Sequence, residues 1–385
     1  MYKKRITSAV MLMTLSSSAA ALSGTDARSI AMGGTGVASS SYLTAPFYNP
    51  AQLTKFYQSD NFGALLPSVS IGISDKDDLY GRISDFQDAD SASRADPLNI
   101  NKGLARISAL ENIGTRDVNV DAELGFAVTF PNQFLSLNLF SHTQAVSRVE
   151  ASVSAQDLNP VNIGQPMTSY VHGASAATFE IGLAMAKAFS LPYRGNVLSL
   201  GISPKVQKLA VHNVKETVDS FDNDKYRVPG NYVTASVFNA DVGMSYKPSQ
   251  EVTVGLSARN VIAQELKSEV SSGSQITYLI EPSYTLGVAY DNRWLLLAAD
   301  LELNETRHFE EFAANNRYLK LGAEIDAWNW AQFRVGYSVS TKEKEPNLAS
   351  AGIGFTPFGK MGVDIGVQYR GERDLAASAQ FVMTF

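Results

Sequence analysis

Charged side chains recur at alternate positions along stretches of the chain that otherwise carry apolar residues. These charged positions are Asp241, Arg259, Asp300, Glu302, Glu324, Arg334, Asp364 and Arg370. Two carboxylates on one face could act as the acid and base of a glycoside hydrolase, but any acidic face supplies such pairs. Because both signs occur, we interpret this face as one whose charges pair with one another or are hydrated. A role in selectivity is the alternative.

Nucleophilic and metal chemistry have little support in the sequence. The chain contains no cysteine, and its four histidines (His142, His172, His212 and His308) are far apart, without metal-ligand spacing. Ser141 precedes His142, but neighbouring residues of a strand point to opposite faces, so the two cannot act together. The Gly-x-Ser-x-Gly pattern of a nucleophile elbow is absent. We therefore predict no catalytic residue, no metal site, no cofactor and no enzymatic activity.

The elements that position the charged residues are predicted to be β-strands. About fourteen segments alternate apolar residues with small or polar ones, as in residues 363–370 and 376–385. Short connections (131–132, 248–250, 291–292, 327–330, 358–360) alternate with long ones (75–118, 145–175, 212–231, 263–282, 304–316, 341–348). A β-sandwich would also alternate in hydropathy, but it would not sort its loop lengths so regularly. The pattern predicts an all-β transmembrane antiparallel barrel of about 14 strands, with the charged residues above as lumen-facing candidates.

The long connection 75–118 carries its own periodicity. Apolar residues follow a helical spacing at Leu98, Ile100, Leu104, Ile107 and Leu110, with Asn101 as a possible N-cap. In a barrel, such a long connection is expected on the extracellular side. A surface helix and a substrate-contacting helix are both consistent with this pattern.

The last ten residues alternate between two faces and end on an aromatic ring. Phe381 and Phe385 fall on the apolar face. This ending resembles the C-terminal signal of bacterial outer-membrane barrels, which implies the barrel assembly machinery as a partner. A plain sandwich strand is the alternative, although an exposed apolar edge invites aggregation, whereas a closed barrel has no free edge.

The start of the chain predicts export. Lys3, Lys4 and Arg5 precede a short apolar run, and an Ala-x-Ala site follows, so residues 1–21 are predicted to be a signal peptide. No run of about 18 apolar residues predicts a transmembrane helix. The net charge of −6 offers no basic footprint for nucleic acid. Periplasm, secretion and the outer membrane remain, and the strand pattern favours the bacterial outer membrane with the lipid bilayer as partner.

A glycine-rich stretch follows the signal. Gly33, Gly34 and Gly36 lack the spacing and the Lys-Ser/Thr pair of a phosphate-binding loop. Residues 28–38 (RSIAMGGTGVA) and 47–53 (FYNPAQL) instead resemble the N-terminus of the FadL-type outer-membrane transport proteins, in particular a TraF-like plasmid-transfer subset. The resemblance implies a hatch inside the lumen at residues 22–58, with Asn49, Pro50 and Ala51 as its recurrent core, and a barrel over residues 59–385.

Two functions follow from this resemblance. A FadL-like channel would allow passive uptake of hydrophobic small molecules across the outer membrane, with a rearrangement of the hatch. A TraF-like protein could instead be a structural or assembly component of a conjugative-transfer or secretion machine, without transport activity.

Overall fold

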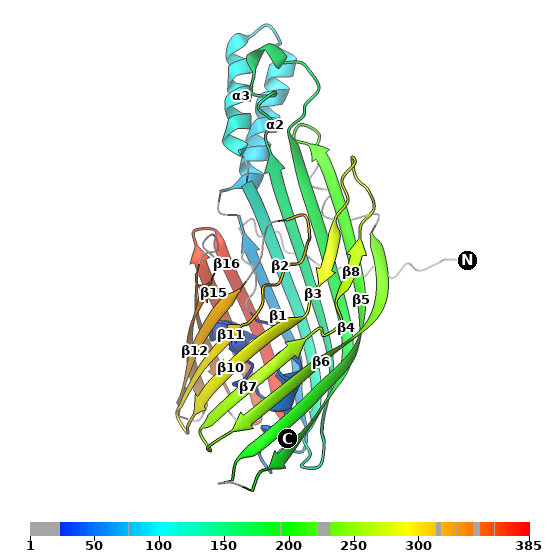
Figure 1. The fold of residues 1–385 in the computed structure, drawn as a ribbon. Helices are drawn as coiled ribbons and strands as arrows, with labels where there is room; N and C mark the ends of the chain where they lie inside the picture. The colour runs from blue at the N-terminus through cyan, green and yellow to red at the C-terminus, as the bar shows by residue number, and fades with distance from the viewer. Residues whose placement is uncertain are drawn as a thin grey trace, which may run out of the picture.

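A computed structural model describes residues 24–75, 77–114, 116–192, 195–221, 232–312, 317–328, 330–341, 347–357 and 359–385. The predicted signal peptide lies outside these residues. Fourteen of the described strands form one closed antiparallel barrel in which each strand pairs with its neighbours along the chain (Figure 1). The fold class predicted from hydropathy alternation is thus confirmed. Among the helices of the described ranges, none has the length and apolar character needed to cross a bilayer.

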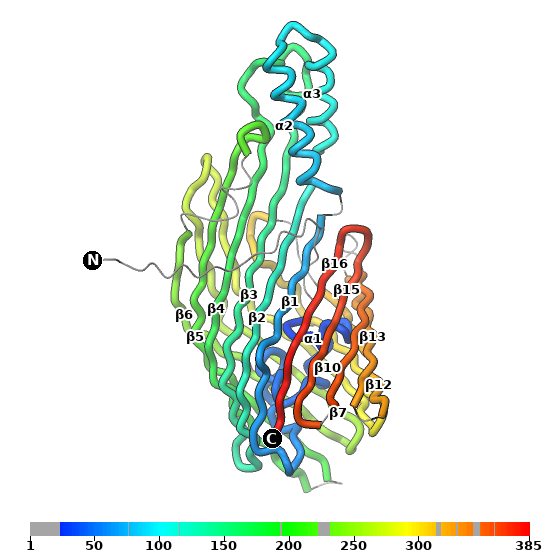
Figure 2. Tube along the Cα trace, turned by 180° about the vertical axis from the view of Figure 1, so that it is seen from behind, coloured from blue at the N-terminus to red at the C-terminus, as the bar shows by residue number. Residues whose placement is uncertain are grey.

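The barrel strands differ greatly in length. They are β1 (Gly63–Ser74), β2 (Arg116–Phe130), β3 (Ser136–Ser152), β4 (Tyr170–Ser190), β5 (Val197–Thr217), β6 (Val233–Lys247), β7 (Val252–Arg259), β10 (Ser283–Asp291), β11 (Leu295–Glu302), β12 (Tyr318–Ala327), β13 (Ala331–Ser340), β14 (Leu348–Phe355), β15 (Met361–Gly371) and β16 (Asp374–Thr384). The wall is tallest along β2 to β5, and this side rises well beyond the rest (Figures 1 and 2).

The barrel closes between its first and last strands. β1 pairs with β16 from Gly63 opposite Thr384 to Ser74 opposite Asp374. The terminal residue completes the seam, because the Phe385 nitrogen donates to the Phe62 carbonyl at 2.8 Å. The Phe385 ring lies 6.3 Å from the ring of Phe62, and Phe381 lies on the outer face of β16. A contact of this strand with the assembly machinery stays a prediction.

The two faces of the wall have the composition of a membrane barrel. Along β15, Val363, Ile365 and Val367 point outward and are 43–50% exposed, while Asp364 and Gln368 point inward and are buried. An apolar outer face with a polar inner face is what a barrel in a bilayer requires, because lipid cannot solvate polar groups.

The connections differ between the two ends of the barrel. One end carries short turns, such as residues 131–135, 248–251 and 292–294. The other end carries the helices α2 (Leu79–Ala95) and α3 (Ile100–Ile113), which stand above the barrel as a hairpin, and the short helix η3 (Pro160–Asn162) (Figure 1). In outer-membrane barrels the end with short turns faces the periplasm.

The helical hairpin corrects two details of the predicted connection 75–118. It contains two helices, and α3 begins one residue after its N-cap Asn99, whose side chain accepts from the Lys102 nitrogen; Asn101 lies inside the helix. The apolar residues at the start of α3 are exposed, since the face of α3 that packs carries Arg106 and Leu110. Arg106 binds Asp90 of α2 at 2.5 Å, so an ion pair lies beside the apolar cluster that includes Leu110 and Phe86.

One other long connection is shorter than expected, and a second contains strands of its own. β3 and β4 extend to Ser152 and Tyr170, so the connection predicted at 145–175 shrinks to 153–169. The predicted connection 263–282 contains a two-stranded sheet of β8 (Gln264–Lys267) and β9 (Thr277–Ile280). The reason lies in the inner face, where the outer parts of β3, β4 and β5 carry apolar instead of polar side chains. Strands with this reversed polarity do not follow the pattern used to predict them.

Candidate functional site: the occupied lumen

Two separate parts of the chain fill the lumen. We call residues 24–58 the hatch; it contains α1 (Ala27–Ala31), η1 (Ala45–Phe47) and η2 (Pro50–Thr54) and lies in the half of the lumen that carries the short turns (Figure 2). We call residues 264–280 and 303–312 together the insert; it packs on the inner face of β3 to β5 in the other half.

A belt of inward-facing glycines forms the seat of the hatch. Its members are Gly201, Gly243, Gly255, Gly287, Gly322, Gly336, Gly352 and Gly366. They face one another across neighbouring strands in four pairs: 201 with 243, 255 with 287, 322 with 336, and 352 with 366. A Cβ at Gly336 would overlap the Gly33 nitrogen, and one at Gly322 would lie 2.5 Å from the Met32 carbonyl oxygen. The belt therefore lets the hatch backbone lie directly on the backbone of the wall.

The glycines of the predicted hatch motif form the turn after α1. Gly33 and Gly34 have φ angles of +70° and +84°, a region that glycine adopts without strain. The Gly33 nitrogen donates to Ser350 Oγ at 2.9 Å, and its carbonyl accepts from Ser338 Oγ at 2.6 Å. The backbone nitrogens of Gly36 and Val37 both donate to one oxygen of Asp300, at 2.7 and 2.9 Å. These bonds fix the turn to β11, β13 and β14.

The Asn-Pro-Ala core lies on the opposite side of the hatch. The Asn49 side chain caps η2, because its Oδ1 accepts from the Ala51 nitrogen at 3.0 Å. Its Nδ2 donates to the carbonyls of Val37 (2.8 Å) and Met244 (3.1 Å). Asn49 thus joins two parts of the hatch to strand β6. Pro50 begins η2, where a proline needs no amide hydrogen, and lies against the glycine belt.

Three of the predicted lumen residues form one charged network with the hatch. Glu324 accepts from Arg28 of α1 at 2.7 and 3.0 Å and from Arg334 at 2.6 Å. Arg334 also binds Asp364 at 2.5 Å. Gln380 donates to Asp364 and accepts from the Ala27 nitrogen, which returns the network to the hatch. The network joins α1 to four wall strands, β12, β13, β15 and β16.

The remaining predicted lumen residues lie outside this network. Asp241 pairs with Lys205 at 2.9 Å, and Glu302 pairs with Lys320 at 2.8 Å. Arg370 lies 3.7 Å from Asp374. Asp300 binds the hatch turn as described. Arg259 makes no hydrogen bond or ion pair with the described residues, and its Nε is buried.

The sequence did not reveal a second buried network, which crosses β2 to β6. His142 lies 3.1 Å from Glu123 and 3.5 Å from Glu180. Glu180 also binds the fully buried Lys205 at 3.1 Å. Glu123, His142 and Glu180 each fall on the polar face of their own alternating segment, which was the signal available in the sequence. Lys205 gave no such signal, because Pro204 interrupts the alternation of its segment.

The insert is held by an apolar cluster and by hydrogen bonds from the wall, such as that of Asn213 Nδ2 to the Ser274 carbonyl at 2.8 Å. Ile276, Tyr278, Phe309 and Phe312 form a buried cluster with inward residues of the wall, namely Val146, Ala174, Ala176, Leu209 and Val211. The Tyr278 hydroxyl lies 2.8 Å from Thr178 Oγ1. This part of the lumen is therefore lined largely by apolar side chains, whereas the part that holds the hatch combines an apolar patch with the charged network.

Burial shifts the pKa of titratable groups in both elements. Burial raises the pKa of Asp26, the N-cap of α1, although hydrogen bonds with Tyr48 and Ser29 oppose the shift. In the insert, burial and then the nearby Arg148 charge lower the pKa of His308 to about 4.

A cavity of about 240 Å³ separates the hatch from the insert. Thr25 and Val37 of the hatch line it on one side, and Ile280 and His308 on the other. Most of its other lining residues are polar or charged and come from the wall, Arg259 among them. We call it the chamber.

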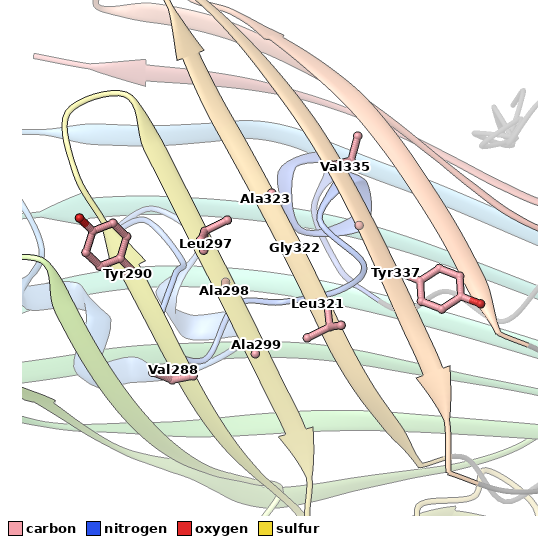
Figure 3. A pocket seen from close by; sticks show the side chains of 11 residues that line it. Val288, Tyr290, Leu297, Ala298, Ala299, Leu321, Gly322, Ala323, Val335 and Tyr337 are labelled. Carbon is pink, nitrogen blue, oxygen red and sulfur yellow. The ribbon is translucent and has the colours of Figure 1, made fainter.

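The outer face carries a groove of about 530 Å³ over β10 to β13. Its apolar walls include Tyr290, Leu297 and Tyr337 (Figure 3). Gly322 and Gly336 line this groove and also form part of the hatch seat on the inner face. At this point the wall between bilayer and hatch is a backbone without side chains.

Comparisons with solved structures give the fold a known type. The toluene transporter TbuX of Ralstonia pickettii is 12% identical, with a TM-score of 0.56 over 94% of this chain and 99% of that chain. The toluene transporter TodX of P. putida is 11% identical, with a TM-score of 0.53 over 95% and 99%. The barrel is therefore of the FadL type, and the protein is located in the bacterial outer membrane. A search of curated proteins found no match.

A family model settles the relationship by sequence. The model described as "F plasmid transfer operon, TraF, protein" matches residues 46–302, which run from the second half of the hatch to the end of β11. The chain belongs to this TraF family.

Proposed function

We propose that the protein is a gated outer-membrane channel for the passive uptake of hydrophobic small molecules. The supporting observation is the apolar lining of the lumen beneath the insert. Inward positions of a membrane barrel are normally polar, yet here Val146, Leu209 and Val211 face Tyr278 and Phe309. When the insert swings away, an apolar surface opens toward the extracellular side, and an apolar ligand can take the place of the insert's own side chains.

The gate is the hatch, which blocks the periplasmic half of the lumen. Side chains from many strands hold the hatch in its seat, so these bonds must rearrange before a ligand can pass. The toluene transporters with this fold make small aromatic hydrocarbons the first ligands to test.

The experiment measures the binding of naphthalene to purified protein by its fluorescence. Phe309→Ser removes an aromatic anchor of the closed insert. Because naphthalene competes with the insert for the same apolar surface, we expect the variant to bind naphthalene more tightly than the wild type. Phe134→Ser, in an exposed turn at the periplasmic end, is the control. The proposal fails if the wild-type protein does not bind naphthalene saturably, or if both variants behave like the wild type.

A second candidate function is a structural role in conjugative transfer, which the description of the family suggests. The helical hairpin supports it with an exposed apolar tip, where Leu98, Ile100 and Val161 are 78–95% exposed. Exposed apolar clusters above the membrane often bind partners. Deleting residues 79–113 should then reduce plasmid transfer while naphthalene binding persists. Unchanged transfer would exclude a role for the hairpin.

A further inference from the structure

The chamber contains one positive charge, that of Arg259, for which the described residues supply no hydrogen-bond or ion-pair partner. The other charged groups that line it have partners: Lys320 binds Glu302 at 2.8 Å, and Arg307 binds Glu281 at 3.3 Å. The carboxylates Glu123 and Asp300 bind His142 and the hatch backbone. Arg370, also in the lining, lies 3.7 Å from Asp374.

Arg259 is different. It ends β7 on the inner face, opposite Ser283 of β10. Among the described residues its guanidinium has no hydrogen-bond or ion-pair partner, and its Nε is shielded from solvent. Glu180 carries the nearby negative charge, but Lys205 and Gln207 bind it at 3.1 and 2.8 Å. An unpartnered guanidinium in a partly buried site is costly unless a ligand or water satisfies it.

We propose that the chamber is a binding site for a compact oxyanion, a small polar carboxylate or phosphate, with Arg259 as its anchor. The planar guanidinium can donate two parallel hydrogen bonds to such a group. Ser283, Thr285 and Thr306 also line the chamber and offer hydroxyl donors. The volume of about 240 Å³ lies below the range of about 300–1,000 Å³ usual for drug-sized ligands. The polar lining suits a ligand without an apolar tail.

This site is distinct from the apolar surface of the insert, and it does not depend on the proposed uptake of hydrophobic molecules. An anion in the chamber would lie between the hatch and the insert and contact residues of both.

Isothermal titration calorimetry with succinate and with inorganic phosphate, at constant ionic strength, tests the proposal on the purified full-length protein. We expect saturable binding of at least one probe. Arg259→Gln should weaken that binding about tenfold or more, because a charge-assisted hydrogen bond is lost. Arg259→Lys should retain part of it. Arg293→Gln removes one positive charge from an exposed turn and should leave binding unchanged.

Heat-modifiability on a gel confirms that each variant is a folded barrel, and naphthalene binding reports the other proposed site separately. Equal affinities of the wild type and Arg259→Gln would overturn the proposal, as would the absence of binding for both probes. Tighter binding of octanoate than of succinate would also overturn it, because the site would then select an apolar tail.

Discussion

The hatch and the insert occupy two halves of one lumen, and the balance of polar and apolar contacts that hold them differs. Hydrogen bonds, ion pairs and a glycine belt hold the hatch beside its apolar contacts with the wall, so many of its contacts have a required direction or distance. The buried cluster around Tyr278 and Phe309 holds the insert. Apolar contact is non-directional and depends mainly on the area removed from water.

This difference in contacts indicates how each of the two elements can move. A hatch bound by many directional contacts has one well-defined position, and a small misfit disturbs many bonds together. An insert bound by apolar area can open at a cost that another apolar molecule offsets. We infer that the insert responds to ligand and that the hatch sets the closed state.

The largest effect is expected from a side chain placed in the hatch seat. Gly336→Leu puts its Cβ on the backbone of Gly33, which cannot yield as a flexible side chain would. Overpacking a core typically costs about 1–3 kcal/mol and can cost more, and here the hatch should leave its seat. Because the chain lacks cysteine, Ser40→Cys provides a single buried reporter in the hatch. Its thiol should change from protected to rapidly labelled by a maleimide.

The matched control is Gly371→Leu at the end of β15, where an added Cβ meets no atom within 4 Å. Its reporter should stay protected, and both proteins should remain heat-modifiable barrels. A protected reporter in Gly336→Leu would show that the belt does not determine how closely the hatch approaches.

A smaller effect is expected from breaking the charged network. Glu324→Gln leaves Arg28 and Arg334 without their shared carboxylate. Removing one partner of a buried ion pair costs about 3–5 kcal/mol. The cost here should be lower, since the Arg28 and Glu324 side chains are 20% and 14% exposed. The Ser40→Cys reporter should be labelled faster than in the wild type but slower than in Gly336→Leu. Glu372→Gln, in an exposed turn, should not change the labelling rate. Equal labelling rates in the wild type, Glu324→Gln and Gly336→Leu would contradict this ranking.

The same contrast explains what could be predicted from the sequence. The barrel, its approximate strand number and its closed seam follow from a two-residue period that the bilayer imposes on every spanning strand. Asp241, Arg334 and Asp364 lie on the inner face for the same reason. Their partners could not be predicted, because parity gives a face but not a register.

The insert could not be predicted from the same pattern. Where β3 to β5 rise toward the insert, Val146 and Ala174 point inward and Ser147 and Ser175 are partly exposed on the other face. The polarity reverses because the inner face packs against Tyr278 and Phe309. A strand prediction that expects an apolar outer face and a polar inner face therefore assigns this segment to a loop. The glycines of the belt were visible in the sequence, but their role needs the hatch backbone, which lies more than a hundred residues away along the chain.

The most local predicted effect is a pH dependence confined to the insert. The pKa of His308 is lowered from 6.5 to about 4, first by burial and then by Arg148. The closed insert therefore favours the neutral imidazole, while an opened insert restores the ordinary pKa. The closed state has its full stability above about pH 6.5, and this stability falls as the pH decreases toward 4, by at most about 3 kcal/mol. Naphthalene binding should strengthen between pH 7 and pH 5.

His308→Gln stays neutral throughout this range, so its naphthalene binding should not change with pH. His212→Gln, on β5, keeps the insert histidine and should show the wild-type pH dependence. The Ser40→Cys reporter of the hatch should stay protected at both pH values, since the measurement disturbs the apolar side alone. If acid exposes the hatch reporter while naphthalene binding stays constant, the hatch and not the insert responds to pH, and the assignment of the two elements is wrong.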